Sequence, residues 1–419
     1  MNKDGAVRFS ALAINYGGAL THSDRFPPEH MQQPVDTGAV AAVRELRMEG
    51  WSLVLASNAG AHQDRPLALR PAGIEDLFTA LVVSHDIGVD KPCDAFLPGS
   101  PGRWFGVFGT VMSVPLNELP HWLPAWCLDH LGSGPSDVLF RSQQVSMVFG
   151  LRLAGGRDVV VKARADEGRA ASCVAAQARL AERGFPCARP LTPVVGVGAL
   201  AVHAEEFRPG GEVLHGDSPD LAVRCAEVFA RLMAELAGVI VAPPLPNPPW
   251  VRWDETGSGT WPAMDFLDDL DQSVVSEHIV QAAERARGRL LTAGLPCVLG
   301  HADFEAQNLR WQGRQVWAVH DWDSLAWQPE AALVGAASGS FASAGSPTLA
   351  PIESSAAFLA AYQDFRGRLF TPVELEIAWA ASVWMAAYNA REMALCGGPP
   401  AGGDALRAQA AERLRRANA

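Results

Sequence analysis

The stretch HADFEAQN, residues 301–308, and the shorter stretch DWD, residues 321–323, decide the fold predicted for this chain. Residues 309–311 and 316–319 between them are mostly apolar and have the composition of two short strands, and Gly313 lies in the turn that joins them. The acid and amide side chains therefore lie on two loops, one at each end of a predicted hairpin.

Side chains of these two loops have the chemistry that phosphoryl transfer requires. The acceptor hydroxyl must be oriented and lose its proton, while metal ions neutralise the phosphate oxygens. Asp303 is predicted to accept the hydroxyl proton, and the side-chain oxygens of Asn308 and Asp321 are predicted to bind Mg²⁺, which prefers oxygen ligands. Asp323 is a further candidate metal ligand. His301 is predicted to brace the loop by hydrogen bonds, with direct participation in the chemistry as the alternative.

The spacing from His301 through Asp303 to Asn308, and on to Asp321, resembles that of the aminoglycoside phosphotransferase family. The resemblance implies a bilobal protein-kinase-like domain over residues 121–419, with ATP and Mg²⁺ as cofactors. It also implies transfer of the γ-phosphate to a hydroxyl of a small molecule, such as an aminoglycoside or a related amino sugar or alcohol.

A strand that ends in lysine precedes this region. Residues 138–153 alternate apolar and polar side chains around a loop, and residues 158–162 form another strand, with Lys162 at its end. Lys162 is one of only three lysines in the chain, and its ammonium group suits the α- and β-phosphates of ATP as a compact point charge. We therefore predict that Lys162 binds the nucleotide. The alternative is a lysine that only caps an edge strand.

The resemblance suggests further nucleotide contacts. Ser142 and Ser146 flank the loop between the first strands and are predicted to contact the nucleotide. Glu205 and Phe207 lie in a segment that resembles the family's hinge, where backbone groups bind adenine. In the family the lysine pairs with a glutamate of the next helix, expected here at about residues 168–183, but no glutamate there is a secure match.

Residues 11–21 have the pattern of an apolar strand that runs into a glycine turn, residues 53–58 that of a second apolar strand, and residues 84–89 lead to Lys91. With these features the first 98 residues resemble a haloacid dehalogenase-like phosphatase, a Rossmann-like α/β unit. Asn15 occupies the position of the nucleophilic aspartate, and an amide cannot form the acyl-phosphate intermediate. We therefore expect a degenerate unit with a structural or docking role. Asn15, Ser57, Asn58 and Lys91 remain candidates for a vestigial anion site.

The length of 419 residues predicts two joined units, because a domain usually has about 100 to 200 residues. We expect the degenerate unit at residues 1–98 and a linker at 99–120. The phosphotransferase-like domain follows at 121–419, divided into a β-rich lobe at 121–207 and a helical lobe at 208–419.

The net charge of −12 disfavours a nucleic-acid partner, which requires a basic surface. It is compatible with a cationic acceptor drawn to an acidic cleft. Asp265, Asp268, Asp269 and Asp271 lie where family members build the acceptor pocket, although such acid runs are most often solvated faces or helix N-termini.

The composition also bears on membrane association, cellular location and the state of the cysteines. No apolar stretch of about 18 residues could cross a bilayer, so we expect no membrane partner and a cytoplasmic protein. Seven scattered cysteines argue against disulfides and against zinc. Residues 335–351, which are rich in glycine and serine, are predicted to form a loop. The oligomeric state has no sequence signal.

Two alternative functions stay open. The amino-terminal unit could act as a phosphatase, which Asn15 disfavours. The second unit could instead be a kinase-like protein that binds a ligand without turnover.

Overall fold

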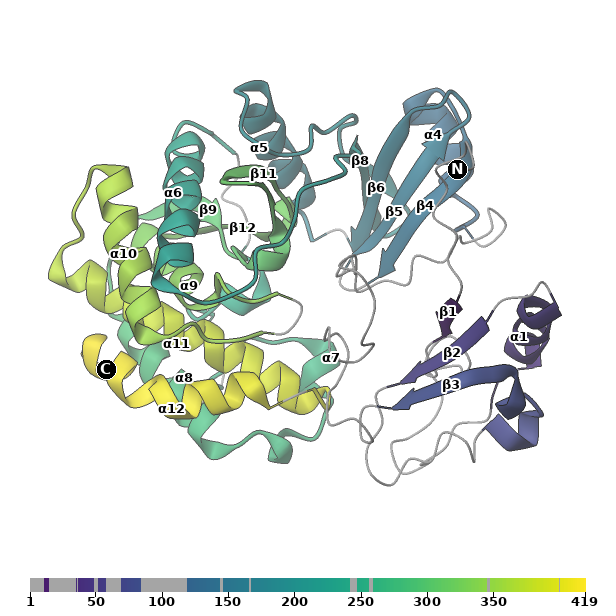
Figure 1. Ribbon diagram of the computed structural model, residues 1–419. Helices are drawn as coiled ribbons and strands as arrows, with labels where there is room; N and C mark the ends of the chain where they lie inside the picture. The colour runs from purple at the N-terminus through teal and green to yellow at the C-terminus, as the bar shows by residue number, and fades with distance from the viewer. Residues whose placement is uncertain are drawn as a thin grey trace. The chain divides into compact units, whose positions relative to one another are not determined.

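The structure is a computed structural model that divides into two compact units, residues 1–106 and 107–419 (Figure 1). It describes residues 11–14, 35, 37–48, 52–57, 69–83 and 119–419, with gaps at 144–145, 166, 242–246, 256–258, 345–346 and 399. The division between the units falls inside the segment predicted as a linker.

The described part of the first unit is a parallel sheet with one helix. The strands pair in the order β1 (Ala11–Ile14), β2 (Ser52–Ser57) and β3 (Phe78–Val83), and α1 (Thr37–Met48) connects the first two. Parallel neighbours need such a crossover connection. Val43 of α1 is buried in one core with apolar side chains of β2 and β3.

These elements do not show the predicted haloacid dehalogenase-like unit. Asn15, Asn58 and Lys91 lie outside the described residues, and so does the side chain of Ser57. The vestigial anion site therefore stays a prediction.

The second unit contains a five-stranded antiparallel sheet. Its strands, in sheet order, are β4 (Pro135–Gln143), β5 (Met147–Leu153), β6 (Asp158–Ala165), β8 (Leu200–Glu206) and β7 (Val195–Val197). Two helices belong to this lobe, α4 (Leu123–Leu131) and α5 (Ala170–Glu182).

The two faces of this sheet differ because alternate residues of a strand point to opposite sides. Val159, Val161 and Ala163 of β6 are fully buried in a core shared with α4. Lys162 and Arg164 lie on the opposite face, where both pair with carboxylates. The sheet thus presents a polar face to the rest of the unit.

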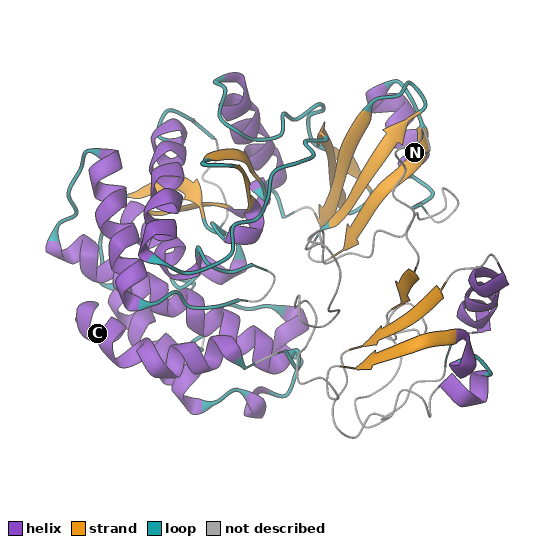
Figure 2. Ribbon diagram, viewed as in Figure 1, coloured by secondary structure: helices purple, strands orange, loops and turns teal. Residues whose placement is uncertain are grey.

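Helices make up most of the remaining chain (Figure 2). They are α6 (Pro219–Leu236), α7 (Asp265–Asp268), α8 (Glu277–Leu291), α9 (Glu330–Ser340), α10 (Ile352–Arg366), α11 (Pro372–Leu395) and α12 (Ala401–Arg416). Two antiparallel strand pairs accompany them: β9 (Cys297–His301) with β12 (Leu325–Pro329), and β10 (Leu309–Gln312) with β11 (Gln315–Val319). The predicted order of a β-rich lobe and a helical lobe is confirmed.

Helix α11 begins at a strong local signal. The side chain of Thr371 accepts a hydrogen bond from the backbone of Glu374, whose own side chain accepts one from the backbone of Thr371. This reciprocal pair satisfies backbone donors that the first turn leaves without partners. Pro372 at the first helical position supplies a fixed φ.

Helix α9 overturns part of a prediction. Segment 335–351 was predicted as a loop, yet its first residues, up to Ser340, belong to α9, whose residues from Ala331 to Ser340 are all buried. A Cβ added to Gly335 would lie 2.0 Å from the carbonyl oxygen of Ala378 on α11. The small side chains therefore serve close packing of two helices rather than a loop.

None of the helices in the described ranges is long and apolar enough to cross a membrane.

Candidate active site

The loop after β9 joins Asp303 to Asn308. The amide nitrogen of Asn308 donates to the carbonyl oxygen of Asp303 at 3.0 Å and to its carboxylate at 2.8 Å. Both contacts use the nitrogen, so the amide oxygen is the atom that Asn308 retains for a metal. This is the atom that the sequence predicts as a ligand.

Asp321 follows β11 in an unusual backbone conformation. Its φ of 59° and ψ of 50° are left-handed, and among the described non-glycine residues only Asn418 also has a positive φ. Such a conformation costs about 1 to 3 kcal/mol and persists only where the surroundings enforce it. The hydroxyl of Ser324 donates to the Asp321 carboxylate at 2.5 Å, which fixes its orientation.

The carboxylate of Asp321 lies close enough to that of Asp303 to affect its ionisation. Burial and the charge of Asp321 raise the pKa of Asp303 to about 7, against the lowering effect of the bond from Asn308. Two carboxylates that lie close together in a partly buried site resist ionising together. A divalent cation at Asn308 and Asp321 would relieve that repulsion, and the oxygen donors present fit Mg²⁺.

Some metal sites consist only of histidine, cysteine, aspartate and glutamate side chains. Over the described ranges, no three such side chains are grouped to hold a metal. The proposed ligand set fits this result because one of its members is the amide of Asn308.

Glu305 is a member of the site that the sequence analysis missed. Its side chain is 5% exposed and accepts a hydrogen bond from Gln307 at 2.8 Å. Burial and the charge of Asp303 raise its pKa well above the usual value. It lies inside the HADFEAQN stretch, but no spacing rule distinguished it from a solvated acid.

His301 uses both ring nitrogens on the backbone. Its Nε2 lies 3.0 Å from the carbonyl oxygen of His320, and its Nδ1 accepts from the backbone N–H of Asp303 at 3.2 Å. Burial lowers its pKa, even though Asp321 acts in the other direction. A neutral ring that joins the two loops supports the predicted bracing role.

The partner of Lys162 is Glu205. Their side chains form an ion pair at 2.9 Å, with 13% and 4% of the side chains exposed. Lys162 lies opposite His203 in the strand register, so Glu205, two residues farther along β8, lies on the same face. Gln177 of α5 donates to the same carboxylate at 2.8 Å. The helix expected to provide a glutamate provides this amide instead.

This pairing gives the side chain of Glu205 a partner within the sheet, and the predicted hinge contact of Glu205 with the nucleotide stays a prediction. Its carboxylate is directed at Lys162 because both belong to the polar face of the sheet. Burial alone would lower the pKa of Lys162, but the charges of Glu205 and Asp323 outweigh burial and raise it. The lysine is therefore held in its charged form.

Asp323 connects the two lobes. Its carboxylate lies 2.9 Å from Arg164 and 3.3 Å from the hydroxyl of Ser146. Burial raises the pKa of Asp323, but Arg164 and Lys162 outweigh burial and keep it below the usual value. These contacts occupy the carboxylate that was a further candidate metal ligand. Arg164 had one overlooked signal, its place two residues after Lys162 on one strand face.

The other two predicted nucleotide contacts have different surroundings. Ser142 pairs with Val148 in the strand register of β4 and β5. Phe207, just after β8, packs on Phe140 with ring centroids 6.0 Å apart. The nucleotide-binding roles of Ser142 and Phe207 stay predictions.

Two of the four aspartates expected at an acceptor pocket, Asp268 and Asp271, form contacts within the fold. Asp268 pairs with Arg391 at 2.8 Å, and Asp271 accepts from the backbone N–H of Ser273 at 3.0 Å. The side chain of Asp265 is not described. Glu392 on α11 acts on Asp303 by its charge, and it is the better candidate for an acidic group near the catalytic loop.

Comparisons with known proteins give weak similarities. No family model matches the chain, and no curated protein matches it. Among solved structures, one from Ralstonia eutropha, provisionally named an aminoglycoside phosphotransferase, shares 18% identity over 71% of this chain and 97% of its own, with a TM-score of 0.47. An amicoumacin kinase with AMP-PNP and Ca²⁺ shares 14% over 67% and 88%, with a TM-score of 0.48.

A spectinomycin phosphotransferase with ADP and spectinomycin shares 10% identity over 71% of this chain and 93% of its own, with a TM-score of 0.43. Similarities of this size do not assign an activity or a substrate to the chain. The functional conclusion therefore depends on the chemistry of the site.

Proposed function

We propose that residues 121–419 form a protein-kinase-like domain that transfers the γ-phosphate of ATP to a hydroxyl of a small molecule. The observation that carries the proposal is the convergence of Asp303, Asn308 and Asp321 in one partly buried group. Lys162 supports it, because the charge of Asp321 reaches that lysine and a buried glutamate holds it.

Each residue has a defined task in the proposed reaction. Asp303 takes the proton of the acceptor hydroxyl while the hydroxyl oxygen forms a bond to the γ-phosphorus. The bond from that phosphorus to the bridging oxygen of ADP breaks. Lys162 binds the α- and β-phosphates. Mg²⁺, held by Asn308 and Asp321, would neutralise the phosphate oxygens and ease the ionisation of Asp303.

The decisive experiment measures ADP formation by the full chain. We expect turnover that needs Mg²⁺ and an acceptor, found in a panel of amino sugars and amino alcohols. Asp303→Asn should lower kcat by about 10² to 10⁴, the usual contribution of a general base, with the Kd for ATP nearly unchanged. Asp364→Asn, which removes an exposed carboxylate of α10, is the matched control.

Two results would contradict the proposal. One is a protein that neither binds ATP nor forms ADP with any alcohol in the panel. The other is Asp303→Asn that turns over at the wild-type rate. ATP binding that survives with no turnover in either protein would favour the kinase-like binding protein instead.

The acceptor is proposed to carry an amine. Glu392, which is partly buried on α11, and Glu305 both lie close enough to Asp303 for their charges to interact with it. Acidic groups near a catalytic base attract a cation. We expect an amino sugar to have a higher kcat/KM than its N-acetylated form, and Glu392→Gln to reduce that preference while sparing the neutral acceptor. An unchanged preference would remove Glu392 from the acceptor site.

A further inference from the structure

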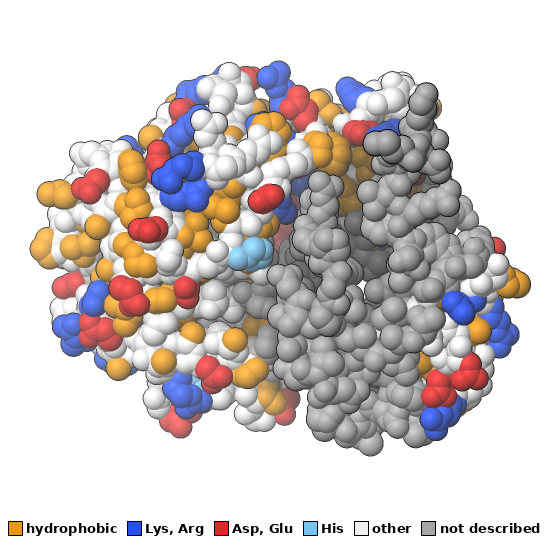
Figure 3. Space-filling model, viewed as in Figure 1, with side chains coloured by type: hydrophobic (Ala, Val, Ile, Leu, Met, Phe, Trp, Pro, Cys, Tyr) orange, Lys and Arg blue, Asp and Glu red, His pale blue; other side chains and the backbone are white. Residues whose placement is uncertain are grey.

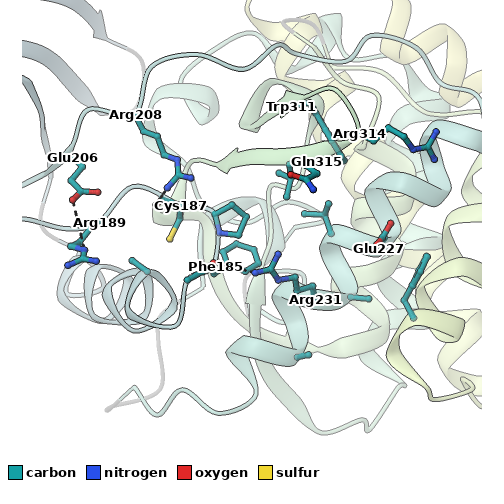
Figure 4. Close-up of a pocket in the computed structure, with 18 residues that line it drawn as sticks. Phe185, Cys187, Arg189, Glu206, Arg208, Glu227, Arg231, Trp311, Arg314 and Gln315 are labelled. Atoms are coloured by element: carbon teal, nitrogen blue, oxygen red, sulfur yellow. Dashed lines mark hydrogen bonds and ion pairs between the residues drawn. The ribbon is translucent and has the colours of Figure 1, made fainter.

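A cavity of about 740 Å³ lies in the second unit, away from the proposed phosphoryl-transfer site. Its walls come from the end of α5 with residues 184–189, from the hinge residues Glu206 and Arg208, from α6, and from the hairpin of β10 and β11 (Figure 4). Its lining includes neither Asp303 nor Asp321 nor Lys162. It is therefore a separate candidate site.

The polar lining of this cavity is basic. Four arginines line it, Arg189, Arg208, Arg231 and Arg314, against the two acids Glu206 and Glu227. This excess of positive charge lies in a chain whose net charge is −12. Figure 3 shows basic side chains gathered over α6, which supplies one wall. The local field therefore favours an anion.

Two of the arginines are held in place by aromatic rings. The guanidinium of Arg208 lies 4.5 Å from the ring centroid of Trp317, and that of Arg231 lies 5.3 Å from the centroid of Phe185. Figure 4 shows Arg208 and Arg231 approaching Phe185 and Cys187 from different sides, with Arg314 farther out. Stacking fixes the plane of a guanidinium and so prepares its donors for a carboxylate or a phosphate.

Arg208 is also fixed by the backbone. One of its terminal nitrogens donates to the carbonyl oxygen of Cys187 at 3.0 Å. This bond holds the guanidinium at the wall of the cavity.

The rest of the lining is apolar. Phe185, Val228, Val316 and Phe365 contribute carbon surface to it. The volume lies in the range of about 300 to 1,000 Å³ found for sites of small molecules. A ligand that fits therefore combines an anionic group with an apolar body.

We propose that this cavity binds a small organic anion, a carboxylate or a phosphate monoester attached to an apolar ring. The proposal does not rest on the proposed kinase activity, because the cavity shares no residue with the catalytic loop.

Binding is tested by isothermal titration of the full chain without ATP. The probes are phenyl phosphate and phenylacetate as the two anion arms, benzyl alcohol as the neutral analogue, and inorganic phosphate as the anion alone. We expect at least one anionic ring compound to bind, and benzyl alcohol and inorganic phosphate to bind about tenfold more weakly or not at all. Equal binding of benzyl alcohol, or of inorganic phosphate, would overturn the proposal.

Variants locate the bound probe. Arg231→Gln should weaken binding about tenfold, because a charge-assisted hydrogen bond is lost. Arg314→Gln, at an exposed position of the hairpin turn where unfolding is not a concern, should weaken it in the same direction. Arg407→Gln, which removes the same charge from an exposed position of α12, should leave binding unchanged.

Two outcomes would place the anion elsewhere. Undiminished binding by folded Arg231→Gln and Arg314→Gln would exclude the cavity. Loss of binding in Lys162→Ala would place the probe in the nucleotide site and overturn the proposal, whereas retained binding supports it. Thermal unfolding midpoints of each variant separate loss of a contact from loss of the fold.

Discussion

At the scale of single residues, the site depends on a carboxyl group whose ionisation is opposed by its surroundings. Burial and the charge of Asp321 raise the pKa of Asp303 to about 7. In the unfolded chain that pKa returns to about 4. The folded protein therefore binds a proton that the unfolded chain releases between these values, so Asp303 contributes stability below pH 4 that is lost as the pH rises through 7.

This sign gives a prediction for the metal-free protein. In EDTA, the free energy of unfolding should fall between pH 5 and pH 8, with a contribution from Asp303 on the order of a few kcal/mol. Asp303→Asn removes that contribution and should flatten the curve. Urea unfolding at several pH values measures it. A wild type and a variant with parallel curves would show that Asp303 ionises normally.

At the scale of elements, the pair of Lys162 and Glu205 ties β6 to β8. Glu205→Gln would remove the carboxylate in direct contact with a buried ammonium and should lower the free energy of unfolding by about 3 to 5 kcal/mol. Replacing both residues by methionine should recover much of this loss, since neither charge of the pair then remains. Urea unfolding of the two variants tests this, and a double variant no more stable than Glu205→Gln would refute it.

The contact of α9 with α11 gives a second prediction at this scale. Gly335→Ala should destabilise the protein by about 1 to 3 kcal/mol or more, because the new methyl group has no space beside Ala378. Gly288→Ala in α8 is the matched control, since a Cβ there meets nothing within 4 Å. It should be neutral or stabilising by up to about 1 kcal/mol. Equal changes in stability for the two variants would mean that helix propensity, and not packing, determines the effect of the substitution.

The same elements mark what the sequence could and could not predict. The order of Asp303, Asn308 and Asp321 along two loops is visible in the sequence, because short-range spacing brings these groups together. Lys162 was found by its strand, but its partner depends on the register between β6 and β8. Residues 335–340 of α9 were mistaken for part of a loop, because their small side chains have the composition of a linker until the surface they pack against is known.

At the scale of the whole molecule, the chain consists of two units with separate cores. A unit with its own core is expected to fold alone. Residues 107–419, expressed by themselves, should therefore unfold cooperatively and keep the ATP-dependent turnover of the full chain. Circular dichroism and ADP formation check the two parts of this prediction. Loss of turnover in a well-folded fragment would show that the first unit contributes to activity.

The ion pair between neighbouring strands has a consequence for control. In protein kinases the corresponding lysine depends on a glutamate from a mobile helix, so displacing that helix turns the enzyme off. Here the sheet itself supplies the counter-charge, and α5 adds only the amide of Gln177. An outward movement of α5 would therefore leave the counter-charge of Lys162 in place, and regulation of the proposed activity would have to act on another element.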